Sequence, residues 1–381
     1  MGRMSRKGMK TFSDNNTLAF FELLRAGLWE SEARLSALKD IDFAAIMRLA
    51  EEQSVVGLIA AGLEHVVDEK VPREVVLQFI GSTMQIERRN KAMNEFVAQL
   101  MERLRTEGVF ALLVKGQGIA QCYEKPLWRS CGDVDLLLMA MEYEKAKELL
   151  VPLASAVETE NTHFKHVGMM LDGWEVELHG TLHTRLSRRI DKQIDALQED
   201  TLTKGQVRTW RCGDTDVFLP SPDNDVIFVF THILHHSFFE GVGLRQICDW
   251  CRLLWTYRDE IDRTGLAFRL DAMGIMSEWK AFAMYAVEYL GMPVEAMPLY
   301  AEAVKWSRKA ARINAFVLEV GNFGHNQMRD YRGMSYVGRK VKSFFGRMGD
   351  MLRHFAIFPK DSIVFFGGVL RSGLYAAVRG E

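Results

Sequence analysis

The spacing of the apolar residues changes twice along the chain, near residues 108 and 220. Before residue 108 and after residue 220, apolar residues recur every three to four positions, which predicts amphipathic α-helices. Between them they form short runs bounded by glycine and other turn residues, which are typical of buried β-strands. The runs are VFALLVK (109–115), DVDLLLM (133–139), HFKHVGMML (163–171), WEVELHG (174–180), QVRTWRC (206–212) and TDVFLP (215–220). The sequence therefore predicts an α+β fold, with a small mixed β-sheet flanked by N- and C-terminal helical regions.

This pattern divides the chain into four predicted segments. They are an N-terminal helical region (1–107), an α/β core (108–220), a C-terminal helical region (221–330) and a basic tail (331–381). The last four runs of the core pair across Asp172-Gly173 and Gly213-Asp214, which predicts two hairpins. The tail has nine Lys and Arg against three Asp and Glu, with aromatic residues interleaved. We expect it to pack on the acidic body of the chain or on a partner protein, or alternatively to contact an anionic membrane or nucleic-acid surface.

Charge and cysteine usage narrow the class of protein. The net charge of -2 gives no global attraction to nucleic acid or to a membrane. The five cysteines are an odd, scattered set, unlike a disulfide framework. No apolar segment follows the basic N-terminal residues as in a secretory signal, and no apolar run of about 18 residues predicts a spanning helix. We therefore expect a reduced, cytoplasmic protein.

Two carboxylates begin an apolar run in the core. Asp133 and Asp135 are two residues apart, so on a strand both side chains point to one face. Two like charges this close are costly unless a cation neutralises them, and carboxylate oxygens suit Mg²⁺. A third carboxylate is expected from WEVELHG. We prefer Glu177, which lies nearer the strand end, over Glu175.

A glycine-rich turn precedes this strand. Lys115, Gly116 and Gln117 follow the apolar run 109–114 and begin a short predicted helix. Glycine lets backbone N–H groups approach a phosphate, and Lys115 adds a mobile positive charge. Arg129 lies four residues before Asp133 and could bind phosphate oxygens in a fork. The alternative is that Lys115 and Arg129 are ion-pair partners of the same aspartates.

These residues carry a family resemblance. KGQGIAQCYEKPLWRSCGDVDLLL (115–138) resembles the signature of the nucleotidyltransferase superfamily that includes DNA polymerase β. The resemblance is greatest to a bacterial family of uncharacterised nucleotidyltransferases and covers roughly residues 40–290. VELHG (176–180), THILHH (231–236) and the Arg245 and Asp249 that follow continue the pattern. Gln117 stands where the superfamily usually has serine, and the gap to the first aspartate is longer.

The resemblance implies a nucleotidyltransferase core that uses Mg²⁺ or Mn²⁺. It would transfer a nucleoside monophosphate from an NTP to an unidentified acceptor and release pyrophosphate. Asp133, Asp135 and Glu177 would be the catalytic metal ligands, and nucleotide phosphates would contact four residues: Lys115, Gly116, Gln117 and Arg129. The acceptor could be a small molecule, a sugar or a protein. Nucleic acid is less favoured, because the body of the chain lacks a basic stripe with stacked aromatic residues.

Seven of the ten histidines lie between residues 163 and 236. His232 and His236 share one helix face, but no glutamate lies between them as in the zincin motif. They could line the pocket with His179, pack between the sheet and the following helices, or serve a His-based metallohydrolase. A catalytically inactive nucleotide-binding scaffold is the other alternative. Cys248 and Cys251 are expected to be core residues. Arg245 and Asp249 are expected to pair on one helix, and the family resemblance leaves open that they face the site.

Overall fold

The computed structural model describes residues 14–162, 165–239 and 241–321, with a few positions near the C-terminus (355, 357–360, 362–364 and 367). The basic tail predicted at 331–381 lies outside the described residues apart from those positions, and its role stays a prediction. Among the described residues, no helix combines the length and the apolarity needed to cross a bilayer.

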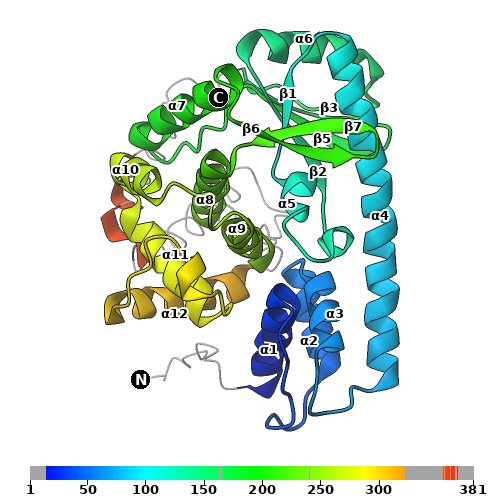
Figure 1. Ribbon diagram of the computed structural model, residues 1–381, viewed down its shortest axis with the longest axis vertical. Coiled ribbons are helices and arrows are strands. Elements are labelled where there is room, and N and C mark those ends of the chain that lie inside the picture. Colours follow the sequence, from blue (N-terminus) through cyan, green and yellow to red (C-terminus); the bar gives the residue numbers. More distant parts are fainter. Residues whose placement is uncertain are drawn as a thin grey trace, which may run out of the picture.

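A mixed β-sheet forms the centre of the predicted α/β core (Figure 1). Its strands, in spatial order, are β1 (Ala111–Val114), β2 (Asp133–Leu138), β5 (Trp174–His179), β4 (His166–Leu171) and β3 (Ala156–Val157). β2 and β5 are parallel, and the other neighbours are antiparallel. A separate hairpin, β6 (Val207–Cys212) and β7 (Thr215–Pro220), lies beside this sheet. The predicted α+β class with a mixed sheet is confirmed, as are the two hairpins.

One face of the sheet is apolar and covered by helices. α4 (Arg73–Thr106) begins after Pro72 and runs the length of the molecule (Figure 1). Its C-terminal half and α6 (Ala140–Leu150) pack on alternate residues of the strands, including Val134, Leu136 and Val176. The period-two alternation of strands therefore sends Asp133, Asp135 and Glu177 to the opposite face. That face carries the candidate site.

The two predicted helical regions share a single hydrophobic core. α1 (Asn15–Trp29), α2 (Phe43–Glu52) and α3 (Val56–Glu64) pack with the helices that follow the sheet. These are α8 (Pro222–Phe239), α9 (Leu244–Thr256), α10 (Arg263–Met273), α11 (Met276–Glu288) and α12 (Val304–Val320). The Trp29 indole N–H donates to the Leu290 carbonyl at 2.6 Å, and Gln53 Nε2 to that of Val317 at 3.0 Å. The chain thus forms one α/β body and one helical body built from both ends.

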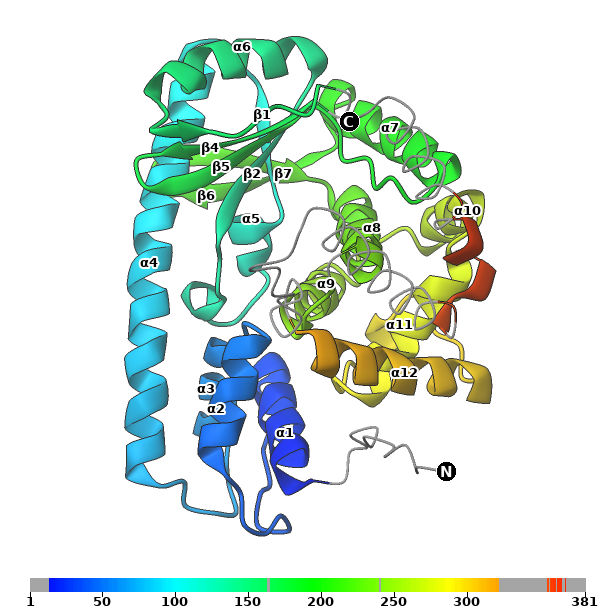
Figure 2. The same cartoon turned by 180° about the vertical axis from the view of Figure 1, so that it is seen from behind.

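One helix inside the core was not predicted. α7 (Arg188–Thr203) begins at Ser187, whose hydroxyl accepts a hydrogen bond from the Ile190 N–H. Its buried positions, Ile190, Ile194 and Leu197, follow helical spacing. The short remaining elements are α5 (Gly116–Ala120) and three single 3₁₀ turns, at Pro126–Trp128, Val151–Leu153 and Val294–Ala296. α7 and α8 stand beside the polar face of the sheet (Figure 2).

Candidate functional site

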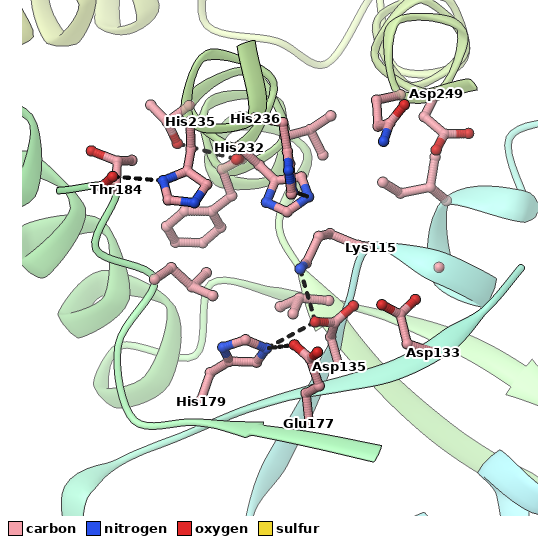
Figure 3. A pocket seen from close by; sticks show the side chains of 18 of the residues that line it. Lys115, Asp133, Asp135, Glu177, His179, Thr184, His232, His235, His236 and Asp249 are labelled. Atoms are coloured by element: carbon pink, nitrogen blue, oxygen red, sulfur yellow. Dashed lines mark hydrogen bonds and ion pairs between the residues drawn. The ribbon is translucent and has the colours of Figure 1, made fainter. Parts of the chain in front are cut away.

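A pocket of about 430 Å³ lies between the polar face of the sheet and helices α8 and α9. Its lining includes Lys115, Asp133, Asp135, Glu177 and His179 from the sheet side. His232, His235 and His236 line it from α8, and Arg245 and Asp249 from α9. Figure 3 shows the carboxylates on one wall and the three α8 histidines on the other, with Lys115 between them. The pocket therefore contains most of the residues that the sequence singled out.

The three predicted metal ligands meet through strand register. Asp133 and Asp135 begin β2, and Glu177 is the partner of Asp135 on the parallel strand β5. Neighbouring residues in register point to the same side of a sheet, so the carboxylates share one face. Glu175 is paired with Asp133 in the same way, but it is exposed and does not line the pocket. The geometry thus favours Glu177 as the third carboxylate, as the sequence prediction preferred.

Lys115 brings a positive charge to these carboxylates. Its Nζ donates to Asp135 Oδ1 at 2.8 Å. Its backbone has φ 59°, which is uncommon for a residue other than glycine, and Gly116 follows with φ 43°. This left-handed turn ends β1 and aims the lysine side chain across β2. Of the two roles weighed for Lys115, the structure shows the ion pair with one of the aspartates.

Asp135 and Glu177 are also held by two histidines. His179 Nε2 donates to Asp135 Oδ1 at 2.8 Å and lies 3.3 Å from Glu177 Oε2. His166 Nε2 lies 3.1 Å from the same Glu177 oxygen. The ligand atoms of His166, Glu177 and His179 all lie within 4.8 Å of one another. These contacts form a compact His–carboxylate cluster at the floor of the pocket.

The pKa values of the cluster follow from these partners. Burial opposes the charged form of Asp135, but Lys115 and His179 outweigh it and hold the pKa of Asp135 below its usual value. For Glu177, hydrogen bonds from His166 and His179 outweigh burial and also lower the pKa. Burial likewise opposes the charge on His179, yet its hydrogen bonds to Asp135 and Glu177 raise the pKa of the imidazole.

Asp133 differs from the other two carboxylates. No hydrogen bond or ion pair joins its side chain to another described residue. The charge on Asp135, followed by burial, raises the pKa of Asp133, and the attraction of Lys115 and Arg245 offsets this only in part. An additional cation at this position would remove the repulsion. Hard carboxylate oxygens on one face are the donor type that a divalent cation prefers, but the oxygens of Asp133, Asp135 and Glu177 do not all lie within 4.8 Å of one another, so a bound ion would have to draw these side chains together.

Gln117 does not reach the pocket with its side chain. The amide is buried, with Nε2 3.4 Å from the Asn90 carbonyl oxygen of α4 and Oε1 2.9 Å from the Cys131 sulfur. Gly116 does line the pocket. The Gln117 side chain therefore joins α5 to α4 and to Cys131, and it does not line the pocket.

Arg129 pairs with a different aspartate from the two considered in the sequence analysis. Its Nε and Nη2 donate to the two oxygens of Asp249 at 3.0 and 2.5 Å, and the Tyr123 hydroxyl donates to Asp249 at 2.7 Å. Arg129 and Asp249 are both buried. The expected pair between Arg245 and Asp249 is wrong, since Asp249 takes these other partners and Arg245 donates to the Ser130 carbonyl at 2.9 Å. The guanidinium of Arg129 joins the strand side of the pocket to α9.

The α8 histidines form the facing wall. The Nε2 atoms of His232 and His236 lie 3.0 Å apart, so one ring donates to the other. Burial, followed by the charge of Lys115, holds the pKa of His232 well below its usual value, so this ring is neutral. His235 Nδ1 donates to the Thr184 carbonyl at 2.7 Å (Figure 3). The α8 histidines therefore both line the pocket and pack against their neighbours, two roles that the sequence analysis had given as alternatives.

One member of the cluster, His166, was missed as a site residue. It is paired with His179 across the β4–β5 hairpin, so the turn at Asp172-Gly173 fixes its position. Counting residues outward from that turn would have placed the two histidines opposite each other. Cys248 and Cys251 are buried and unpaired, which confirms the prediction of core cysteines.

Comparison with known proteins supports the family predicted from the sequence. The family model described as an uncharacterised nucleotidyltransferase matches residues 39–291, more than half of the 381-residue chain. No curated protein and no solved structure shows significant similarity to the chain. The matched range contains the whole sheet, the pocket, and α8 and α9. The chain therefore belongs to this family of uncharacterised nucleotidyltransferases, a class of enzymes that transfer nucleotidyl groups.

Proposed function

We propose that the pocket transfers a nucleoside monophosphate from an NTP to an acceptor and releases pyrophosphate. The observation that carries this proposal is the convergence of Asp133, Asp135 and Glu177 on one face of a mixed sheet, within a chain that matches a nucleotidyltransferase family. These three side chains would hold Mg²⁺ or Mn²⁺. The bound ion supplies charge neutralisation for the triphosphate, activation of the attacking oxygen and stabilisation of the departing pyrophosphate.

The chain's own residues supply the remaining functions. Lys115 exchanges its contact with Asp135 for a phosphate oxygen, which neutralises charge that develops on the triphosphate. Gly116 lets the backbone approach the same phosphates. Arg129 stays with Asp249 and shapes the pocket wall, with its other nitrogen, Nη1, 2.8 Å from the Cys131 sulfur. The side chain of Gln117 takes no part, because it points toward α4.

The acceptor would enter from the α8 side. His232 and His236 lie across the pocket from the carboxylates, and neutral His232 is suited to accept a hydrogen bond from an acceptor hydroxyl. Glu177 is the second group placed to do so. A small molecule, a sugar or a protein side chain fits a pocket of this size better than a nucleic-acid duplex. The cytoplasmic location stays a prediction.

The test measures label transfer from each of the four NTPs, labelled at the α-phosphate, with Mg²⁺ or Mn²⁺ present. We expect pyrophosphate release, and label on an added acceptor or on the protein itself. Glu177→Gln should reduce the rate by at least about 100-fold, because it removes a group that acts on charge in the transition state. Glu175→Gln is the matched control, since it changes a carboxylate of the same strand outside the pocket.

Three results would contradict the proposal. Turnover that persists in a double Asp133→Asn and Asp135→Asn variant would remove the carboxylates from the mechanism. NTP binding without turnover would indicate a nucleotide-binding scaffold. Metal-dependent hydrolysis that is lost in His232→Ala but kept in the double variant would indicate a His-based hydrolase instead.

A further inference from the structure

Two imidazole rings in the pocket aim their nitrogens at one carboxylate oxygen. Glu177 Oε2 lies 3.1 Å from His166 Nε2 and 3.3 Å from His179 Nε2. The ring centroids are 4.8 Å apart, with 42° between the ring planes. Among the residues that the structure describes, only these three form a group of His, Cys, Asp or Glu ligand atoms within mutual metal-binding reach.

The spacing of these atoms resembles that of ligands around one ion. For metal–ligand bonds of about 2.0–2.1 Å, adjacent ligand atoms of a tetrahedral ion are about 3.3–3.4 Å apart. Those of an octahedral ion are about 2.8–3.0 Å apart at the same bond length. The two observed distances to Glu177 Oε2 fall in the range that these geometries span. The third separation, between the two imidazole nitrogens, is at most 4.8 Å, so the rings would have to turn toward a shared point for all three atoms to bind a single ion.

The fold builds this arrangement from rigid elements. Glu177 and His179 are two residues apart on β5, and His166 is the direct partner of His179 on β4. All three side chains therefore rise from the same face of the sheet. The residue opposite Glu177 on β4 is Gly168, so no side chain from that position stands beside the glutamate. The cluster lines the pocket, which leaves one side open for a further ligand.

We propose that His166, His179 and Glu177 form a site for a first-row transition-metal ion such as Zn²⁺ or Mn²⁺. Imidazole nitrogen favours these ions, whereas Mg²⁺ favours oxygen ligands. The site is distinct from the Asp133–Asp135 position and shares Glu177 with it. It goes beyond the proposed function and stands without it, because it concerns binding alone. The pocket thus offers a nitrogen-rich position beside an all-oxygen one.

The test uses Mn²⁺ as a spectroscopic probe of the metal-free full-length protein. Pulsed electron paramagnetic resonance detects ¹⁴N nuclei of imidazole that are bonded to Mn²⁺. We expect nitrogen modulation from the bound ion, reduced in His166→Gln and lost when His179→Gln is added. His65→Gln is the matched control: its imidazole also contacts a carboxylate, Glu30, at 2.9 Å, but outside the pocket. This variant should keep the full modulation.

Zn²⁺ affinity gives a second readout. Calorimetric titration should show that His166→Gln weakens Zn²⁺ binding by at least about 10–100-fold, the cost typical of losing even an outer partner of a metal site. His166 is only half-buried at the start of β4, so this variant should fold, and its melting curve checks that. Asp133→Asn should leave tight Zn²⁺ binding in place.

The outcomes separate this site from the proposed enzyme. Bound Mn²⁺ without nitrogen modulation would overturn the site while leaving carboxylate-dependent transfer intact. Nitrogen modulation unchanged in the double His166→Gln and His179→Gln variant would also overturn it, because other histidines would then hold the ion. Nitrogen modulation that follows the two histidines supports the site, even in a preparation that transfers no nucleotide.

Discussion

Replacement of Asp133 by asparagine should stabilise the metal-free protein. Asp133 has no hydrogen-bond partner among the described residues, and the charge of Asp135 raises its pKa. Two residues along a strand separate the charges by about 7 Å, which at an effective dielectric constant of about 20 gives a repulsion of about 2 kcal/mol. Asparagine removes that repulsion together with the attraction to Lys115 and Arg245. We therefore expect the free energy of unfolding to rise by roughly 1 kcal/mol.

The pH dependence of this gain has a definite sign. A carboxyl group whose pKa is raised by folding binds more protons in the native than in the unfolded state, so it lowers stability as the pH rises through its pKa. The penalty is largest at neutral pH, where Asp133 is ionised in both states. The penalty disappears when the pH falls below 3.8, the ordinary pKa of an aspartate side chain. The advantage of Asp133→Asn should accordingly be present at pH 7 and absent well below pH 3.8.

Urea-induced unfolding is the appropriate assay, with and without Mg²⁺. For a chain of this length, 1 kcal/mol moves Tm by only about 1 °C, so denaturant midpoints resolve it better. Mg²⁺ at about a hundred times its Kd should stabilise the native protein by about 2.7 kcal/mol, and this increment should be lost in Asp133→Asn. A metal-free variant less stable than the parent, or one that keeps the full Mg²⁺ increment, would refute the reasoning.

Two further predictions concern the scaffold. Asp249→Asn should destabilise the protein by about 3–5 kcal/mol in urea titrations, because it leaves the buried Arg129 guanidinium without its carboxylate. As a control, Glu32→Gln breaks an exposed ion pair with Arg34 and should show no measurable change in stability. Gly62→Ala should cost about 1–3 kcal/mol or more, since its Cβ would lie 1.9 Å from a carbonyl oxygen of α1. By contrast, Gly81→Ala on α4 meets nothing within 4 Å and should stabilise by up to about 1 kcal/mol, measured in the same way.

The elements of the sheet could be predicted because local spacing encodes them. A strand places alternate residues on opposite faces, so the run from Asp133 to Leu138 specifies both its burial and the convergence of its two carboxylates. The turn at Asp172-Gly173 likewise specifies the β4–β5 hairpin. In both cases the information lies within a few residues of the structure that it determines.

The partners of charged residues could not be predicted in this way. Arg129 and Asp249 are 120 positions apart in the sequence, and nothing local distinguishes this pair from one between Arg129 and Asp133. The helix α7 was a different kind of omission. Ser187, Ile190, Ile194 and Leu197 gave the signal of a capped amphipathic helix, inside the segment 108–220, in which we predicted mainly strands. His166 became visible only once the hairpin register was applied.

The shape of the pocket depends on how the two bodies of the chain are joined. The carboxylate wall belongs to the sheet, which packs on α4 and α6, whereas the histidine wall belongs to α8, which packs in the shared core of both helical regions. Arg129 lies shortly before β2 in the sequence, and Asp249 lies on α9. Their buried ion pair therefore joins the α/β body to the helical body. A buried ion pair has strict geometric requirements, because misalignment leaves an uncompensated charge. The pair is therefore suited to set the separation of the two walls, a role that a direct phosphate contact of Arg129 would disturb.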